Sequence, residues 1–124
     1  MRILPVFAAV SMLAVAGPAL AHAKLVASTP AANATVASTS SIDLQFSEAL
    51  VGKLSTAELA MTGMPGMAMN APMKMTLKAS LGADQKSLKL ALAKPLAAGS
   101  YKLDYHVTST DTHRINGSLT FTVK

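Results

Sequence analysis

Tyr101-Lys102-Leu103-Asp104-Tyr105-His106-Val107 is the stretch that decides the fold, because apolar and polar residues alternate along it. Successive side chains of a β-strand point to opposite faces, so this alternation predicts a strand with one buried face and one solvated face. The same pattern recurs at 42–46, 87–92 and 119–123. These four segments are the first strands that the sequence predicts.

Weaker alternation predicts further strands at 24–28, 57–62 and 73–80. Turn signals separate the predicted strands, namely Pro30, Asn33, Gly82-Ala83-Asp84, Ala98-Gly99 and Asn116-Gly117. No convincing helical periodicity follows the first residues of the chain, and the chain contains no cysteine for a disulfide. About seven strands in a chain of this length predict an all-β fold, an antiparallel Greek-key sandwich or barrel of the immunoglobulin or cupredoxin-like kind.

The amino terminus has the composition of an export signal. Arg2 gives it a positive charge, residues 3–15 are almost wholly apolar, and Ala19-Leu20-Ala21 is a small-residue cleavage site. The apolar run is interrupted and falls short of the roughly 20 residues that a membrane-spanning helix needs. We therefore expect a cleaved signal peptide over 1–21 and one exported domain over 22–124 that does not span the membrane.

Composition excludes several functional classes. Blue-copper electron-transfer sites require a cysteine thiolate and iron–sulfur clusters usually do, whereas this chain has no cysteine. The chain carries 11 basic and 6 acidic side chains, but its lysines are scattered singly along the sequence. Nucleic-acid binding proteins typically cluster basic residues and interleave them with aromatic ones, so we expect no nucleic-acid partner.

Methionine is concentrated in one short segment: six of the eight methionines lie between Met61 and Met75, where there is no acid, histidine or cysteine. Glycine and proline at 63, 65, 66 and 72 interrupt any helical stripe, so we expect a loop. Thioether sulfur is a soft, uncharged donor that prefers Cu(I) or Ag(I) to hard cations. The alternative is that these methionines are adaptable hydrophobic filler or a partner-binding surface.

A second group of candidate ligands surrounds an Asp-x-His motif, Asp111 and His113. Side chains two apart on extended backbone project to the same side, so the pair can share a metal ion or hydrogen-bond to each other. Cleavage after Ala21 would make His22 the first residue, offering its α-amine and its Nδ1 as a chelate. Together these groups would form the nitrogen and oxygen site that Cu(II) prefers. The alternative is a carboxylate that only orients a surface histidine.

These motifs, in their order along the chain, resemble the CopC-type copper resistance proteins, a family of small periplasmic copper-binding β-sandwiches. The resemblance covers essentially all of residues 22–124. It rests on His22-Ala-Lys-Leu-Val-Ala-Ser-Thr-Pro30, Leu44-Gln-Phe-Ser-Glu48, Met61-Thr-Gly-Met64-Pro-Gly-Met67 with Pro72-Met73, and Ser109-Thr-Asp111-Thr-His113 leading into Gly117-Ser-Leu-Thr-Phe121.

The resemblance implies two copper sites and a periplasmic location. His22, Asp111 and His113 match the Cu(II) ligands of the family, and Glu48 matches an acidic residue near them, although a plain surface acid is an equal reading of Glu48. The matches to the Cu(I) loop are four methionines, Met61, Met64, Met67 and Met73. Some members place a histidine between the third and fourth of these methionines. This chain has Met69 in that interval, which makes Met69 a further candidate ligand.

Two more residues near these sites are interpreted from period alone. Met75 lies two residues after Met73 on a predicted strand and is expected to be core. His106 falls on the face opposite Tyr105 and Val107, so we expect a surface histidine beside a buried tyrosine.

The function that the resemblance implies is a copper carrier without catalytic activity. It would serve copper resistance or homeostasis, or deliver copper to a membrane copper-transport protein. No nucleophile, general base or oxyanion arrangement is evident for hydrolysis. Two alternatives stay open. An N-terminal histidine chelate also builds the copper brace of oxidative polysaccharide enzymes, although the few aromatics here do not predict a substrate platform, and a β-sandwich interaction module would bind no metal tightly.

Overall fold

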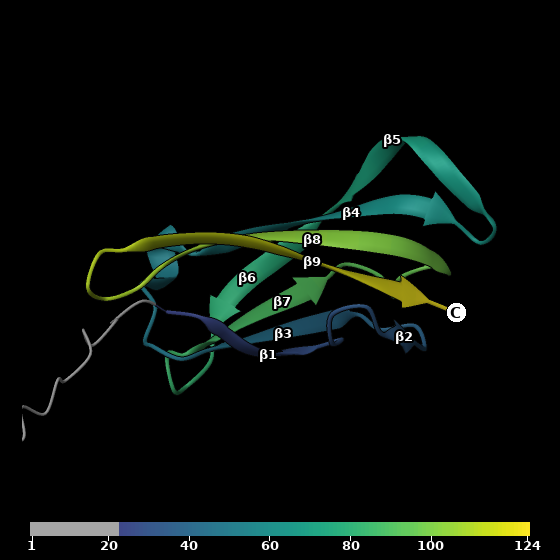
Figure 1. Ribbon diagram of the computed structural model, residues 1–124. Coiled ribbons are helices and arrows are strands. Elements are labelled where there is room, and N and C mark those ends of the chain that lie inside the picture. The colour runs from purple at the N-terminus through teal and green to yellow at the C-terminus, as the bar shows by residue number, and fades with distance from the viewer. Residues whose placement is uncertain (1–22) are drawn as a thin grey trace, which may run out of the picture.

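The computed structural model describes residues 23–124, which form two packed β-sheets (Figure 1). The predicted signal peptide and His22 lie outside the described residues. The first sheet has the strand order β1 (Leu25–Thr29), β3 (Ser41–Phe46), β7 (Ser87–Leu92), β6 (Leu77–Leu81). The second has the order β2 (Thr35–Val36), β9 (Arg114–Val123), β8 (Gly99–Thr108), β4 (Thr56–Met64), β5 (Met67–Met75).

All paired strands are antiparallel except β2, which runs parallel to β9. A short 3₁₀ turn, η1 (Gly52–Leu54), is the one helical element within 23–124. The predicted all-β sandwich is therefore confirmed. The strand count differs from about seven because β2 has only two residues, and because the predicted strand at 73–80 is divided between β5 and β6.

The alternating segments supply the core, as predicted. Along β8 the side chains of Tyr101, Leu103, Tyr105 and Val107 are buried, while His106 between them is exposed. Buried residues of the opposite sheet face them, namely Ile42, Leu44, Phe46, Leu88 and Leu90. Leu59, Leu119 and Phe121 flank them on the neighbouring strands of the same sheet. Burial of this apolar surface drives folding, since no disulfide is available.

One aromatic contact joins the two sheets, and a second lies within the sheet of β8 and β9. Phe46 of β3 meets Tyr105 of β8 edge to face at 5.5 Å between ring centroids, and Tyr101 stacks on Phe121 at the same distance. The Asn116-Gly117 pair, predicted as a turn, instead lies inside β9 opposite His106 and Tyr105. A Cβ atom at Gly117 would clash with the Tyr105 hydroxyl and ring, so this position needs glycine to let the tyrosine ring cross the strand.

The methionine segment is a β-hairpin, and the prediction of a loop was wrong. Pro65 and Gly66 are the two turn residues between β4 and β5, and Gly66 has a φ of 75°. Proline followed by a residue of positive φ is typical of a type II turn. Proline is tolerated in strands at sheet edges and bulges, and β5 is the edge strand of its sheet. Pro72 therefore does not prevent β5 from forming.

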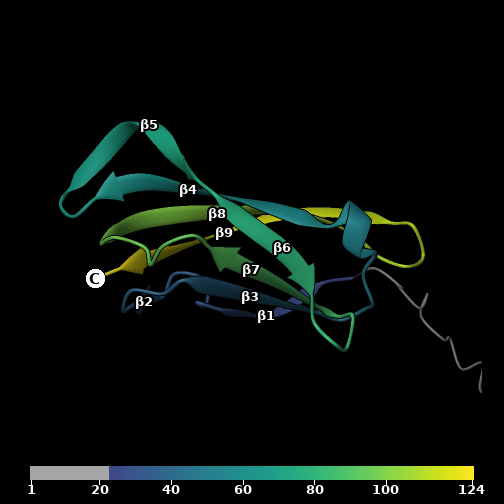
Figure 2. The same cartoon turned by 180° about the vertical axis from the view of Figure 1, so that it is seen from behind.

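The hairpin is irregular in a way that shapes its inner face. Met61 pairs with Met73, whereas Gly63 pairs with Ala68, so β4 advances two residues while β5 advances five. The extra residues of β5 arch away from β4, and the arch is visible in both views of the fold (Figures 1 and 2).

The long strands β8 and β9 run from one end of the sandwich to the other (Figures 1 and 2). The β8–β9 loop, η1 and the start of β1 lie at one end, and the tip of the β4–β5 hairpin projects at the other (Figures 1 and 2). Over residues 23–124, no helix is long and apolar enough to cross a membrane.

Candidate metal centres

The Asp111 and His113 side chains lie in the β8–β9 loop. The loop is closed by hydrogen bonds from the Ser109 amide to the His113 carbonyl at 3.0 Å and from the Thr112 amide to the Ser109 carbonyl at 2.9 Å. Thr112 adopts a φ of 72°, which reverses the chain between β8 and β9. The Thr110 amide donates to the Ala49 carbonyl at 3.0 Å, so the loop is also attached to the segment after β3.

The two side chains are hydrogen-bonded to each other, one of the two arrangements that the i, i+2 spacing predicted. The His113 Nδ1 lies 2.9 Å from the Asp111 Oδ2, and the Ser109 hydroxyl donates to the Asp111 Oδ1. These hydrogen bonds, with that of Ser109 the largest contribution, lower the pKa of Asp111 to about 2. Because an ionised carboxylate only accepts, a neutral His113 must carry its proton on Nδ1, which leaves the metal-binding lone pair on Nε2.

Replacing Ser109 with alanine is expected to raise the pKa of Asp111 from about 2 toward its ordinary value of 3.8, because the strongest hydrogen bond to the carboxylate is lost. A depressed pKa stabilises the fold above pH 4, and this contribution is lost as the pH falls toward 2. An NMR titration of the carboxyl carbons measures the change. Asp84, whose pKa is lowered by Gln45 and its own turn, is the matched control. An unchanged Asp111 titration in Ser109→Ala would contradict this account.

Within 23–124, no three histidine, aspartate or glutamate side chains are close enough to hold a metal ion together. Glu48 is exposed and does not join Asp111 and His113 in such a group. A metal held by the pair therefore needs a donor from elsewhere.

The described chain begins at the same end as the β8–β9 loop (Figure 1). Ala23 is buried, with 2% of its surface exposed. The Lys24 amide donates a hydrogen bond to the Ser47 hydroxyl, and the Ser47 amide donates one to the Lys24 carbonyl. His22 precedes Ala23 directly in the sequence but lies outside the described residues. His106 is exposed on the outer face of β8, which confirms the prediction of a surface histidine, and its Nδ1 donates a hydrogen bond at 2.9 Å to the Asn116 Oδ1.

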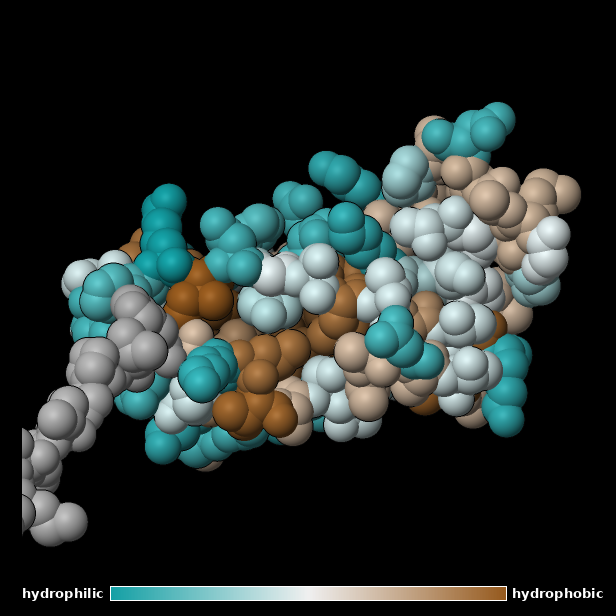
Figure 3. Space-filling model, viewed as in Figure 1, coloured by the Kyte–Doolittle hydropathy of each residue, from teal (hydrophilic) through white to brown (hydrophobic). Residues whose placement is uncertain are grey.

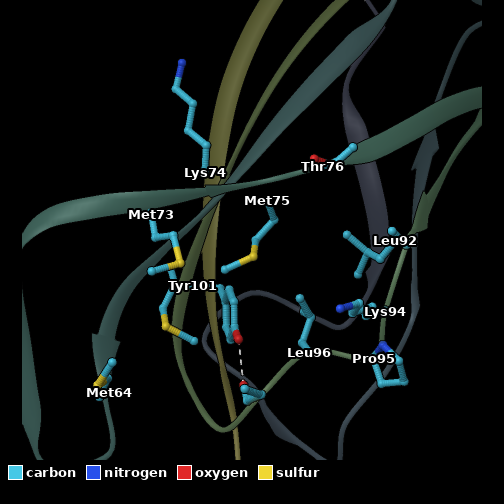
Figure 4. Close-up of a pocket in the computed structure, with 13 residues that line it drawn as sticks. Met64, Met73, Lys74, Met75, Thr76, Leu92, Lys94, Pro95, Leu96 and Tyr101 are labelled. Carbon is cyan, nitrogen blue, oxygen red and sulfur yellow. Dashed lines mark hydrogen bonds between the residues drawn. The ribbon is translucent and has the colours of Figure 1, made fainter.

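At the other end, methionines gather around one cavity of about 490 Å³ (Figure 4). Four thioether side chains line it, those of Met61, Met64, Met73 and Met75. The ring of Tyr101 forms part of the wall, and its hydroxyl donates to the Ala97 carbonyl at 2.6 Å. The remaining wall is formed by Lys74, Thr76 and the segment 92–97, which begins at the last residue of β7.

The predicted methionine ligands differ in their surroundings. Met61 is 6% exposed and belongs to the core, whereas Met64 and Met73 are about half exposed. Met67 is 66% exposed at the hairpin turn, opposite Met64, and Met69 is half-buried against the core. Met67 and Met69 do not line the cavity with the others. The space-filling view shows apolar side chains gathered over the hairpin (Figure 3).

Met75 and Tyr101 are cavity residues that sequence reasoning assigned to the core alone. Met75 is half-buried and packs against the core, as predicted, but it also faces the cavity. The two-residue spacing of Met73 and Met75 already indicated that both lie on one face of a strand. Their place beside Met61 could be inferred only once β5 was known to pair with β4.

Comparison with known proteins gives consistent relationships. The family model of the CopC domain matches residues 25–124. Copper resistance protein C of Xanthomonas campestris pv. juglandis is 52% identical over 106 residues, which cover 86% of this chain and 83% of that protein. Copper resistance protein C of Escherichia coli is 46% identical over 113 residues, covering 91% and 90%.

Two solved structures are similar over most of their length. PcoC, a methionine-rich copper resistance protein from Escherichia coli, is 45% identical with a TM-score of 0.77, covering 84% of this chain and all of that chain. CopC from Methylosinus trichosporium OB3b is 28% identical with a TM-score of 0.71, covering 83% and 94%. With a domain match over nearly the whole described chain and relatives at about half identity, this chain belongs to the CopC family.

Proposed function

We propose that this protein is a periplasmic copper carrier that binds Cu(II) at one end of the sandwich and Cu(I) at the other. The observation that carries the proposal is the separation of donor types. Imidazole and carboxylate lie in the β8–β9 loop, and thioethers gather at the β4–β5 hairpin. Nitrogen and oxygen donors suit Cu(II), whereas thioethers select Cu(I). The relatives named copper resistance proteins support copper as the cargo.

In the proposed Cu(II) site, His22 supplies its α-amine and imidazole, and His113 supplies Nε2. The burial of Ala23 beside this end of the sandwich supports the participation of His22. Asp111 accepts the Nδ1 hydrogen bond of His113, an arrangement that orients metal-ligating histidines in many proteins. A carboxylate at Nδ1 and a metal at Nε2 lie on opposite sides of the ring. Direct binding of Cu(II) by Asp111 therefore requires that hydrogen bond to break.

In the proposed Cu(I) site, the hairpin methionines supply sulfur donors that do not titrate. Three methionines both match the family pattern and line the cavity: Met61, Met64 and Met73. The exposed Met67 fits less well. Within 23–124, Glu48 does not form a three-residue ligand group with Asp111 and His113, so we assign it no role.

Binding and release of copper suit the site better than catalysis. All four aromatic side chains within 23–124 are buried, so none offers a flat exposed surface on which a sugar could stack. This favours the carrier over the copper-brace oxidase. Donor sites at the surface also leave room for a partner, such as a membrane copper-transport protein, to take the ion.

Native mass spectrometry of the protein recovered from the periplasm tests the proposal. We expect a mass that begins at His22 and the simultaneous uptake of one Cu(II) and one Ag(I), the latter standing for Cu(I). Competition between the two ions for a single position would contradict the two-site proposal. A mature chain that begins elsewhere would contradict the Cu(II) ligand set alone.

A further inference from the structure

We propose that Met75 is a sulfur ligand of the soft-metal site, together with Met61, Met64 and Met73, and that Met67 and Met69 lie outside this site. The inference rests on the proposed Cu(I) function of the hairpin and assigns its ligands. The family resemblance alone points instead to Met67, and to Met69 as the replacement for a missing histidine.

Strand pairing places Met75 near Met61 and Met73, while Met64 joins them as a lining residue of the same cavity. Met73 pairs directly with Met61, and Met75 follows Met73 by two residues on the same strand. Residues opposite each other on antiparallel strands have Cβ atoms about 5 Å apart, and the diagonal neighbours, here Met61 and Met75, remain within reach of long side chains. In Figure 4 the side chains of Met73 and Met75 project to the side on which Tyr101 lies, while Lys74 between them points away.

The anchoring of Met75 also favours a ligand role. Thr76 alone separates β5 in one sheet from β6 in the other, so Met75 stands where the chain crosses between the sheets. It is half-buried and touches the core, yet its side chain lines the cavity. A sulfur held in this way loses little conformational entropy on binding a metal. Met67 lies at the exposed turn and would lose more.

The arch in β5 separates Met69 from the cavity. Between Ala68 and Met73 the strand holds more residues than its partner β4, so Met69 is out of register with Met61. Its half-buried side chain packs against the core without lining the cavity. The cavity itself contains no carboxylate or imidazole among its lining residues, which leaves thioether sulfur as the donor for a soft ion.

Methionine-methyl NMR of the mature protein during an Ag(I) titration tests the assignment without any substitution. The methyl signals of Met61, Met64, Met73 and Met75 should shift with saturation at one equivalent, and those of Met67 and Met69 should shift little. Shifts of Met67 and Met69 with Met75 unmoved would overturn the inference while leaving the proposed function intact. A protein that binds no Ag(I) would overturn both.

Single substitutions to leucine provide the second measurement. Leucine matches methionine in volume, so Met75→Leu should fold, which thermal unfolding checks. It should weaken Ag(I) binding by about 10-fold or more, as expected when a metal site loses a ligand, and remove one sulfur from the count given by X-ray absorption. Met67→Leu is the matched control and should change the affinity by less than about threefold, within the range of a side chain that makes no metal contact. Equal losses in both variants would overturn the assignment.

Discussion

An alanine added before His22 should lower the affinity of the mature protein for Cu(II) by about 100-fold or more, since even the partners of metal ligands are worth 10- to 100-fold. The extension converts the α-amine into an amide, which removes one nitrogen donor and the chelate ring that it forms with the imidazole. His113 and Asp111 remain in place, but within 23–124 they are only a pair. Isothermal titration or chelator competition at pH 7.5 measures the loss.

The pH dependence of binding gives an internal check on this prediction. An α-amine has a pKa near 7.7 to 8.0 and an imidazole near 6.5, and both must lose a proton to bind metal. Affinity for Cu(II) should therefore fall steadily from pH 8 to pH 5 in the mature protein. An alanine added after Lys124 is the matched control. Unchanged Cu(II) affinity in the amino-terminal extension would remove His22 from the site.

Simultaneous replacement of Met61, Met64 and Met73 with leucine should reduce Ag(I) affinity by at least about 100-fold, because three of the sulfur donors are lost and leucine offers none. Cu(II) affinity should stay within about twofold, since its donors lie at the other end of the sandwich. Competition titrations with each ion measure the two effects separately, and Ag(I) binding to the unsubstituted protein should hardly change with pH.

The control for this triple variant is its fold. Met61 is in the core, and exchange of methionine for leucine in a core usually costs less than about 1.5 kcal/mol, so the variant should unfold cooperatively at a similar temperature. Retained Cu(II) binding is a second sign that the sandwich is intact. A folded variant that still binds Ag(I) tightly would show that the hairpin cavity is not the soft-metal site.

Alternation predicted the centre of the fold because each strand there has one buried and one solvated face. The predicted segment at 87–92 coincides with β7, and Tyr101 to Val107 lies within β8. Prediction failed where tertiary structure overrides local signals. Pro65 and Gly66 were interpreted as interruptions, but they are the turn that makes the hairpin possible. Asn116 and Gly117 have turn composition, yet they continue β9 because the Tyr105 ring occupies the space above the glycine.

The candidate sites were predictable to the level of donor chemistry. The spacing of Asp111 and His113 predicted that they would meet, and they do so through Nδ1. The sequence could not show which methionines line the cavity and which do not, because this depends on the register shift between Met61 and Gly63. A regular hairpin would present the odd-numbered methionines of β5 on one continuous face, whereas the arch breaks that face in two.

The ten-residue length of β8 sets the distance between the two proposed copper sites. At about 3.3 Å per residue, β8 keeps the loop of Asp111 and the hairpin roughly 30 Å apart. A single ion cannot contact both proposed sites at once, so the sites of one molecule would have to be filled and emptied separately. Occupancy of one site should then leave the affinity of the other unchanged, because the two donor sets share no residue.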